Sequence, residues 1–152
     1  MKISKKFEPL INGLAAGFVI AILALLTFES PFGVWLIFSF GSSALIVFVF
    51  HDSEFAQPRN IFFGHLLAIC IGILINSLLG VSFFSLGLSV ALMMYFKIIH
   101  PPAAANPLIA IFADVSYDFI LFPVIAGSII LILLSILINK FLFKRKYPKR
   151  FI

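Results

Sequence analysis

The sequence predicts an all-α integral membrane protein. Hydrophobic residues make up 62% of the chain and charged residues 11%, whereas a soluble domain has about 25% charged residues. The mean hydropathy is +1.19. Six apolar segments can be distinguished, at 10–28, 32–50, 61–79, 81–96, 103–113 and 119–139. Most of them approach the roughly 20 residues that a helix needs to cross about 30 Å of hydrocarbon.

The two ends of the chain are basic, and together they hold all but two of its lysines and arginines. We therefore divide the chain into a basic N-terminus (1–9), a transmembrane domain (10–139) and a basic C-terminal tail (140–152). Basic residues beside membrane spans are typical of contact with lipid headgroups, so the net charge of +5 does not indicate nucleic acid. Segment 10–28 is too long for a usual signal peptide, which favours a retained first helix.

The charges between the segments predict the topology. Six crossings place both termini and Arg59 in the cytoplasm and leave Glu29, Asp114 and Asp118 outside, as the positive-inside rule prefers. Four crossings with two re-entrant segments also keep both termini inside, so that alternative stays open. We expect the membrane to be a bacterial plasma membrane.

The fifth segment is broken at its start by His100-Pro101-Pro102. Neither proline can donate a backbone hydrogen bond, so a helix that ends at His100 cannot continue through them. The 11 residues of 103–113 reach only about 16 Å, roughly half of the bilayer. A break of this kind survives only inside protein or beside water. It predicts a half-length helix and a site at His100, which either handles an anion or a proton or merely caps loose carbonyls.

Lys97 precedes the break by one turn, so it would share a helix face with His100 if the helix persists that far. Lys97 then either lines a substrate pathway or extends its ammonium to the cytoplasmic lipid headgroups. A shift of 63 residues aligns 41–46 with 104–109, Gly64 with Gly127, and Gly17 with Gly80. Two repeats of three crossings would have opposite orientations, which is a transporter architecture.

Gly41-Ser42-Ser43 lies in the middle of segment 32–50. If a half-helix begins there, its free N–H groups and hydroxyls form an anion-binding helix start. The alternative is that these small residues only permit close helix packing. His65 either lines the path or makes a hydrogen bond in the core. Gly13 and Gly17 form a GxxxG pattern that fits packing against another helix, including one in a second copy of the chain.

The loop before the third segment contains Arg59 between Gln57-Pro58 and Asn60. Arg59 with Gln57 and Asn60 could form a cytoplasmic vestibule that attracts anions. In the alternative interpretation Arg59 pairs with an acidic residue of the same loop, Asp52 or Glu54, and Asn60 caps the following helix.

Several blocks of this sequence resemble the HPP family of integral membrane proteins. They are His100-Pro101-Pro102-Ala103-Ala104-Ala105 preceded by Lys97, Pro31-Phe32-Gly33, Gly41-Ser42-Ser43-Ala44, Asp52-Ser53, Gln57-Pro58-Arg59-Asn60 and Gly64-His65-Leu66-Leu67. The resemblance spans residues 10–139 and implies a compact multi-helix protein. Members from plant chloroplasts and cyanobacteria are associated with nitrite transport. The chain departs from the family pattern at Ala104, where glycine is usual, and at Asn106-Pro107.

No enzyme constellation is present in the sequence. The three histidines lack cysteine or acidic companions at metal-ligand spacing, and no nucleotide-binding glycine pattern occurs. We therefore expect no cofactor and no bound metal. The sequence predicts a transporter or channel for a small inorganic anion, nitrite first, with protons as a second partner; the alternative is a membrane scaffold or assembly subunit. The predicted substrate pathway consists of His100, Lys97, Ser42, Ser43, Gly41, Asn106, His65 and Arg59, with Pro101 and Pro102 as structural breaks.

Overall fold

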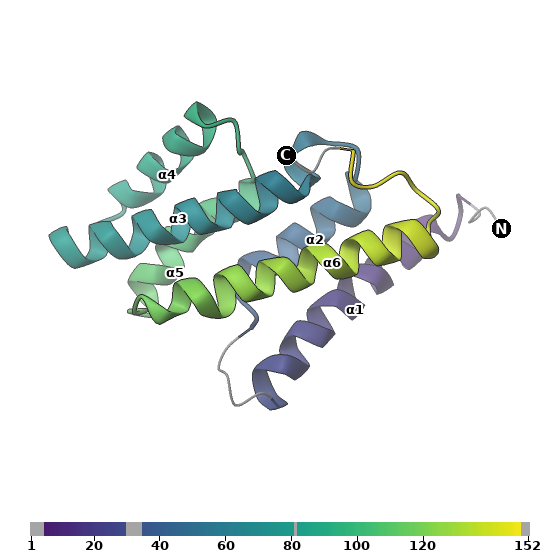
Figure 1. Cartoon of the computed structure of the whole chain (residues 1–152), viewed down its shortest axis with the longest axis horizontal. Coiled ribbons are helices and arrows are strands. Elements are labelled where there is room, and N and C mark those ends of the chain that lie inside the picture. The colour runs from purple at the N-terminus through teal and green to yellow at the C-terminus, as the bar shows by residue number, and fades with distance from the viewer. Residues whose placement is uncertain (1–4, 30–34, 81, 150–152) are drawn as a thin grey trace.

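The described residues form three long and three short helical segments, in the order long, short, long, short, short, long (Figure 1). The computed structural model describes residues 5–29, 35–80 and 82–149. Pro31-Phe32-Gly33, Lys2 and Arg150, which entered the predictions above, lie outside these residues. The long segments are α1 (Glu8–Glu29), α3 (Pro58–Leu79), and η3 (Ile120–Ile125) continued by α6 (Ala126–Phe141). Each has 22 residues and a rise of about 33 Å, enough to cross a bilayer.

The short segments are α2 (Ser39–Val49), α4 (Phe84–Tyr95), and the 3-10 turn η2 (Pro101–Ala105) that leads into α5 (Asn106–Phe112). A further 3-10 turn, η1 (Glu54–Ala56), lies before α3. The all-α class and the half-length fifth segment are confirmed. The sixth segment is less regular than predicted, because Phe122 has an extended backbone before Pro123.

The start of α1 and the end of α6 lie at the same end of the bundle, because Arg145 pairs with Glu8. The loop before α3 and the end of α4 share this end: Tyr147 bonds to Ala56, and Arg59 reaches the carbonyl of Phe96. The start of α1 and the C-terminal tail are thus at one end of the bundle. Among the described residues, large exposed side chains are mainly phenylalanine and leucine on all six helices, as a lipid-facing surface requires.

Polar side chains of the long helices stabilise the non-helical approaches to α2 and α5. Thr27 of α1 accepts hydrogen bonds from the backbone N–H groups of Trp35 (3.0 Å) and Leu36 (3.1 Å). Asn60 of α3 donates to the carbonyl of Ile99 at 2.9 Å. Backbone groups freed from a helix are costly in hydrocarbon, so these contacts are what allows both short helices to begin inside the bundle.

The two halves of the chain are arranged as an inverted repeat. Helices α3 and α6 contact each other and run in opposite directions, with α4 and α1 on opposite flanks (Figure 1). Helix α1 contacts α2 and α6, and α4 correspondingly contacts α5 and α3. A half-turn about the viewing axis of Figure 1 therefore exchanges the halves.

Two glycines 63 residues apart make equivalent contacts. A Cβ atom added at Gly64 would lie 3.2 Å from the carbonyl oxygen of Ile98 and 3.6 Å from Ala103 Cβ. A Cβ added at Gly127 would meet the carbonyl oxygen of Trp35 and the ring of Phe40, each 63 residues earlier than its counterpart. The predicted pairing of Gly17 with Gly80 is wrong: Gly17 lies within α1, whereas Gly80 follows α3 with φ +68°.

We predict that Gly64→Ala and Gly127→Ala both destabilise the protein. Each new methyl group would enter filled space, and overpacking costs about 1–3 kcal/mol. Gly17→Ala is the matched control, because nothing lies within 4 Å of a Cβ added there. Thermal unfolding in detergent should show a lower midpoint for the first two variants and little change for the third. A lower unfolding midpoint for only one of Gly64→Ala and Gly127→Ala would contradict equivalent packing in the two halves.

Candidate functional site

Five buried polar side chains form a cluster in the middle of the bundle, where the two short helices begin. Ser39 is 4% exposed and the other four are 0% exposed. Helix α2 supplies two of them, α3 one, and the segment from the break to α5 the remaining two. The members of this polar cluster are Ser39, Ser43, His65, His100 and Asn106.

Ser43 connects the two histidines. Its Oγ lies 2.9 Å from His65 Nε2 and 2.8 Å from His100 Nε2. The imidazole rings are close to each other as well, with centroids 4.9 Å apart. Ser43 Oγ also lies 3.1 Å from the carbonyl oxygen of Ser39, one turn earlier in α2. A single hydroxyl thus holds together α2, α3 and the break before η2.

The hydrogen-bond partners assign the proton on each neutral ring. His100 Nδ1 lies 2.7 Å from the carbonyl oxygen of Phe55, which can only accept, so Nδ1 carries the hydrogen and Nε2 accepts from Ser43. Asn106 accepts from Ser39 through Oδ1 at 2.8 Å, so its amide nitrogen donates to His65 Nδ1 at 3.1 Å. His65 therefore carries its hydrogen on Nε2 and donates to Ser43.

These assignments give one directed chain. Ser39 donates to Asn106, Asn106 to His65, His65 to Ser43, Ser43 to His100, and His100 to the carbonyl of Phe55. The second hydrogen of the Asn106 amide goes to the His65 carbonyl at 3.1 Å. The Ser43 hydroxyl has one hydrogen, and both His100 Nε2 at 2.8 Å and the Ser39 carbonyl at 3.1 Å can accept it. With this hydrogen on the shorter contact to His100, every member is satisfied while both histidines are neutral, and the cluster needs no added ion in hydrocarbon.

The polar cluster has no acidic partner. All six Asp and Glu residues belong to the described part of the chain, and each is at least partly exposed at the surface. The surroundings are apolar: the ring of Phe40 meets His65 edge-on at 5.0 Å between centroids, and Ala103 is fully buried nearby. A positive charge on either histidine would therefore lack a carboxylate to neutralise it.

Four of the predicted pathway residues come together here, namely His100, Ser43, His65 and Asn106. Gly41 and Ser42 do not, because α2 begins at Ser39 and both residues are exposed on its outer face. The helix start predicted at Gly41-Ser42-Ser43 is therefore two residues too late. Ser39 was missed; its place four residues before Ser43, on the same helix face, was the available signal.

Lys97 and Arg59 also lie away from the polar cluster. Helix α4 ends at Tyr95, and Lys97 has φ 55°, so Lys97 and His100 are not neighbours on a helix face as predicted. Lys97 is exposed at the end of the bundle that holds the termini. Arg59 Nη2 donates to the carbonyl of Phe96 at 3.5 Å, while Asp52 pairs with Lys149 at 2.9 Å and Asn60 donates to the carbonyl of Ile99. The predicted Asp52 pairing and Asn60 helix cap are both wrong.

Pro101 and Pro102 occupy the first turn of η2, where missing N–H groups cost nothing. The exposed Pro101 and buried Pro102 also line a surface pocket of about 330 Å³ together with Ser42. Both prolines thus lie at the break between α4 and α5, where the sequence predicts a structural role for them.

The C-terminal tail folds back over the loop that receives His100. Tyr147, 5% exposed, donates from its hydroxyl to the carbonyl of Ala56 at 2.7 Å, next to the Phe55 carbonyl bonded to His100. Burial raises the pKa of the Tyr147 phenol, so it stays a donor. The hydrogen bond from Lys149 lowers the pKa of Asp52, and burial lowers the pKa of His51.

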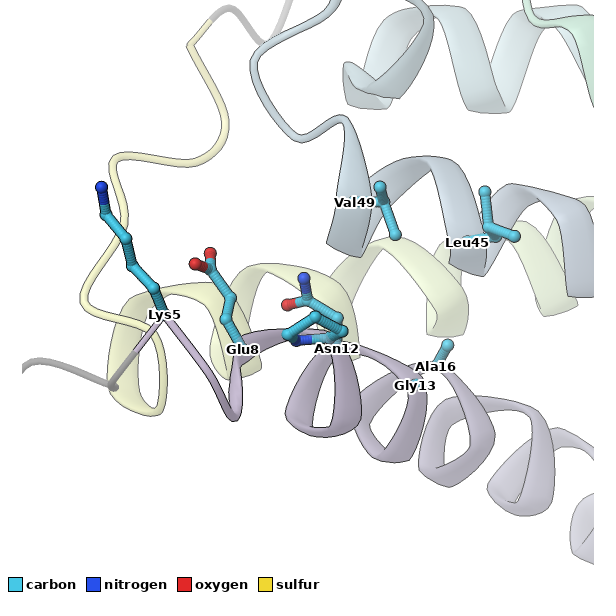
Figure 2. Close-up of a pocket in the computed structure, with 8 residues that line it drawn as sticks. Lys5, Glu8, Asn12, Gly13, Ala16, Leu45 and Val49 are labelled. Carbon is cyan, nitrogen blue, oxygen red and sulfur yellow. The ribbon is translucent and has the colours of Figure 1, made fainter.

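Arg145 was predicted to be a headgroup anchor, but its side chain points inward. It donates to the carbonyl of Phe48 at 2.9 Å and to Asn12 Oδ1 at 3.3 Å, in addition to its pair with Glu8. Asn12 and Glu8 line a pocket of about 370 Å³ between α1 and α2 (Figure 2). This pocket is separate from the polar cluster. Lys144 and Lys146 remain exposed, as an anchor requires.

The chain belongs to the HPP family of integral membrane proteins. The family described as "HPP, transmembrane region" matches residues 2–148, nearly the whole sequence. This match confirms the resemblance based on the His-Pro-Pro break and the blocks around Ser43 and His65. The His-Pro-Pro break, Ser43 and both histidines of the polar cluster thus lie within the matched residues.

Two proteins from Dictyostelium discoideum, each described only as a transmembrane protein, are similar to this chain. One is 34% identical over 125 residues, covering 74% of this chain and 44% of its own length. The other is 32% identical over 127 residues, covering 76% and 41%. The chain therefore spans less than half the length of these relatives. No solved structure matches it.

We predict that Ser43→Ala destabilises the protein much more than Ser42→Ala. Removing the Ser43 hydroxyl leaves a buried donor on His65 and a buried acceptor on His100 without partners, and each such group costs about 1–3 kcal/mol. Ser42 is exposed, so its loss should stay within about 0.5 kcal/mol. Thermal unfolding of both variants in the same detergent tests this, and equal midpoints would show that Ser43 does not join the histidines.

Proposed function

We propose that this protein is a carrier for a small monovalent inorganic anion, nitrite first, moving together with a proton. The observation that supports this most directly is a pair of buried histidines joined by Ser43 with no carboxylate beside them. The proposal places the protein in a bacterial plasma membrane with both termini in the cytoplasm. It assigns no enzymatic activity to the chain.

The charge balance of the polar cluster favours joint binding of a proton and an anion. The cluster is complete when both imidazoles are neutral, and protonating one of them would bury an unpaired cation. A buried charge is costly unless it is paired and hydrogen-bonded. A small anion that enters with the proton pairs with the protonated imidazole, and the proton and anion together carry no net charge. Neutral cargo also avoids the cost of about 2.3 kcal/mol per elementary charge for each 100 mV of membrane potential.

The polar cluster offers the donors that such an anion needs. Ser39, Ser43 and Asn106 carry hydroxyl or amide hydrogens, and a protonated histidine donates from both ring nitrogens. Ser39 is also the first residue of the 11-residue helix α2, whose dipole adds positive potential at this end. An anion bound here would replace internal hydrogen bonds of the chain rather than enter an empty cavity.

The two ends of the hydrogen-bond chain favour a carrier over a channel. One end is the carbonyl of Phe55, and toward the other end the amide of Asn106 stands between His65 and the hydroxyl of Ser39; neither the carbonyl nor the amide relays protons as an imidazole or hydroxyl does. In this closed state a proton can pass between His65 and His100 through Ser43, but it cannot leave. Cargo would then be released only after the helices rearrange, as in transporters built from inverted repeats.

The orientation follows from charge. The chain ends and the loop with Arg59 lie at one end of the bundle, and the positive-inside rule assigns that end to the cytoplasm. Labelling of single cysteines introduced at Lys5 and Lys149 in a Cys70→Ser background tests this orientation. External labelling of either position would contradict it.

The rival proposal is a membrane scaffold whose break and polar cluster are purely structural. Purified protein in liposomes discriminates between the two. A carrier should accelerate nitrite entry over that into empty liposomes at every pH, whereas a scaffold should leave the rate unchanged. Nitrate, formate and chloride serve as comparison anions. If none of the four enters faster than into empty liposomes, transport of small anions is ruled out.

We predict that His100→Gln gives folded protein whose transport stops or loses its dependence on pH. Glutamine can still donate toward Phe55 and accept from Ser43, but it cannot take up a proton. Uptake by the unaltered protein should rise as the outside is acidified from about pH 8 to about pH 5, because imidazole titrates near pH 6.5 before its surroundings act.

His51→Gln is the matched control, since His51 lies in the loop after α2 and outside the polar cluster. It should keep the pH profile of the unaltered protein. Uptake by His100→Gln that matches the unaltered protein across this range would mean that His100 only caps the break.

A further inference from the structure

The chain after α6 forms a strap, residues 142–149, at the end of the bundle that holds the start of α1. The strap runs back from α6 beside the loop 50–57, which joins α2 to α3 (Figure 1). Arg145 fastens the near part of the strap through hydrogen bonds to the carbonyl of Phe48 at 2.9 Å and to Asn12 Oδ1 at 3.3 Å. The strap therefore begins at a fixed point where α1, α2 and α6 meet.

The far part of the strap is attached to the loop at three points. Tyr147 donates from its hydroxyl to the carbonyl of Ala56 at 2.7 Å. The backbone N–H of Lys149 donates to Gln57 Oε1 at 2.8 Å, and the Lys149 ammonium pairs with Asp52 at 2.9 Å. The strap thus holds the last two residues of the loop, directly before α3 begins.

A single layer of backbone separates His100 from the surface at Phe55. The His100 ring is 0% exposed, and its Nδ1 donates to the Phe55 carbonyl at 2.7 Å. The side chain of the same phenylalanine is at the surface, where the residue is 41% exposed. Moving Phe55 and Ala56 outward would therefore open His100 to water at this end of the bundle.

We propose that the strap is the cytoplasmic gate of the polar cluster, and that its release exposes His100. The proposal rests on the proposed function, which requires the cluster to open and assigns this end of the bundle to the cytoplasm. Tyr147 is the central contact of the gate, because it holds the carbonyl next to the one that His100 uses. Hydrogen bonds and one surface ion pair attach the strap to the loop, so this attachment can open locally while the helices stay packed.

Modification of the histidines by diethylpyrocarbonate tests this proposal. The reagent acylates a neutral imidazole that it can reach from water, and peptide mass spectrometry gives separate rates for His100 and His65. Tyr147→Phe keeps the ring and removes the hydrogen bond to Ala56. We expect His100 to react about five- to tenfold faster in this variant, because the loss of one hydrogen bond changes an opening equilibrium by about that factor. His65 should react as in the unaltered protein, since it is linked to the loop only through Ser43 and His100.

Tyr95→Phe is the matched control. Tyr95 is the last residue of α4, at the same end of the bundle but outside the strap, and it is 78% exposed. Its change should leave both rates unaltered. Lys149→Ala is a second, surface variant that removes the pair with Asp52 and keeps the backbone hydrogen bond of the same residue. It should accelerate the reaction of His100 less than Tyr147→Phe does.

Two results would overturn the proposal. If His100 reacts no faster in Tyr147→Phe than in Tyr95→Phe, the strap does not control access to the polar cluster. If His65 is accelerated by the same factor as His100, the hydroxyl stabilises the whole bundle and the opening is not local. The measurement needs neither an anion nor transport, so a failure of the gate is distinct from a failure of nitrite uptake in liposomes.

Discussion

The bridge that Ser43 makes between His65 and His100 is the contact on which the centre of this protein depends. Three segments that are far apart in sequence meet at this one oxygen, at 2.8 and 2.9 Å from the two ring nitrogens. The bridge fixes where α2 lies against α3 and holds the unwound approach to η2 inside the bundle. It also satisfies two imidazoles that would otherwise be buried with unpaired polar atoms, a cost that hydrocarbon makes severe.

The centre could be predicted from the sequence only in part. Pro101 and Pro102 made the break certain because their rings cannot continue a helix, and a histidine at such a break had to be buried or paired. Ser43, His65 and Asn106 were identified by their polarity within apolar segments. Their mutual contacts could not be predicted, because hydrogen bonds across 22 to 67 residues depend on packing rather than on local pattern. For the same reason the start of α2 at Ser39 was placed two residues too late.

The tail shows a second limit of sequence reasoning. Composition assigned its cations to lipid headgroups, and for Lys144 and Lys146 the exposure agrees with that assignment. Arg145 and Tyr147 instead pack against the loop and the start of α1. Nothing in a run of basic residues distinguishes the cation that turns inward, because its partner Glu8 is 137 residues away.

The inverted arrangement of the two halves has an evolutionary consequence. Each half has three segments, so two halves joined in tandem necessarily insert with opposite orientations. An ancestor of half this length would have had to insert both ways to form the same bundle from two identical chains. Fusion removes that requirement, and each position is then free to diverge from its counterpart. Ser43 and Asn106 are such counterparts, 63 residues apart, and so are His65 and Ser128. In an identical pair every side chain at the centre would occur twice, whereas this chain has a histidine at 65 and a serine at 128.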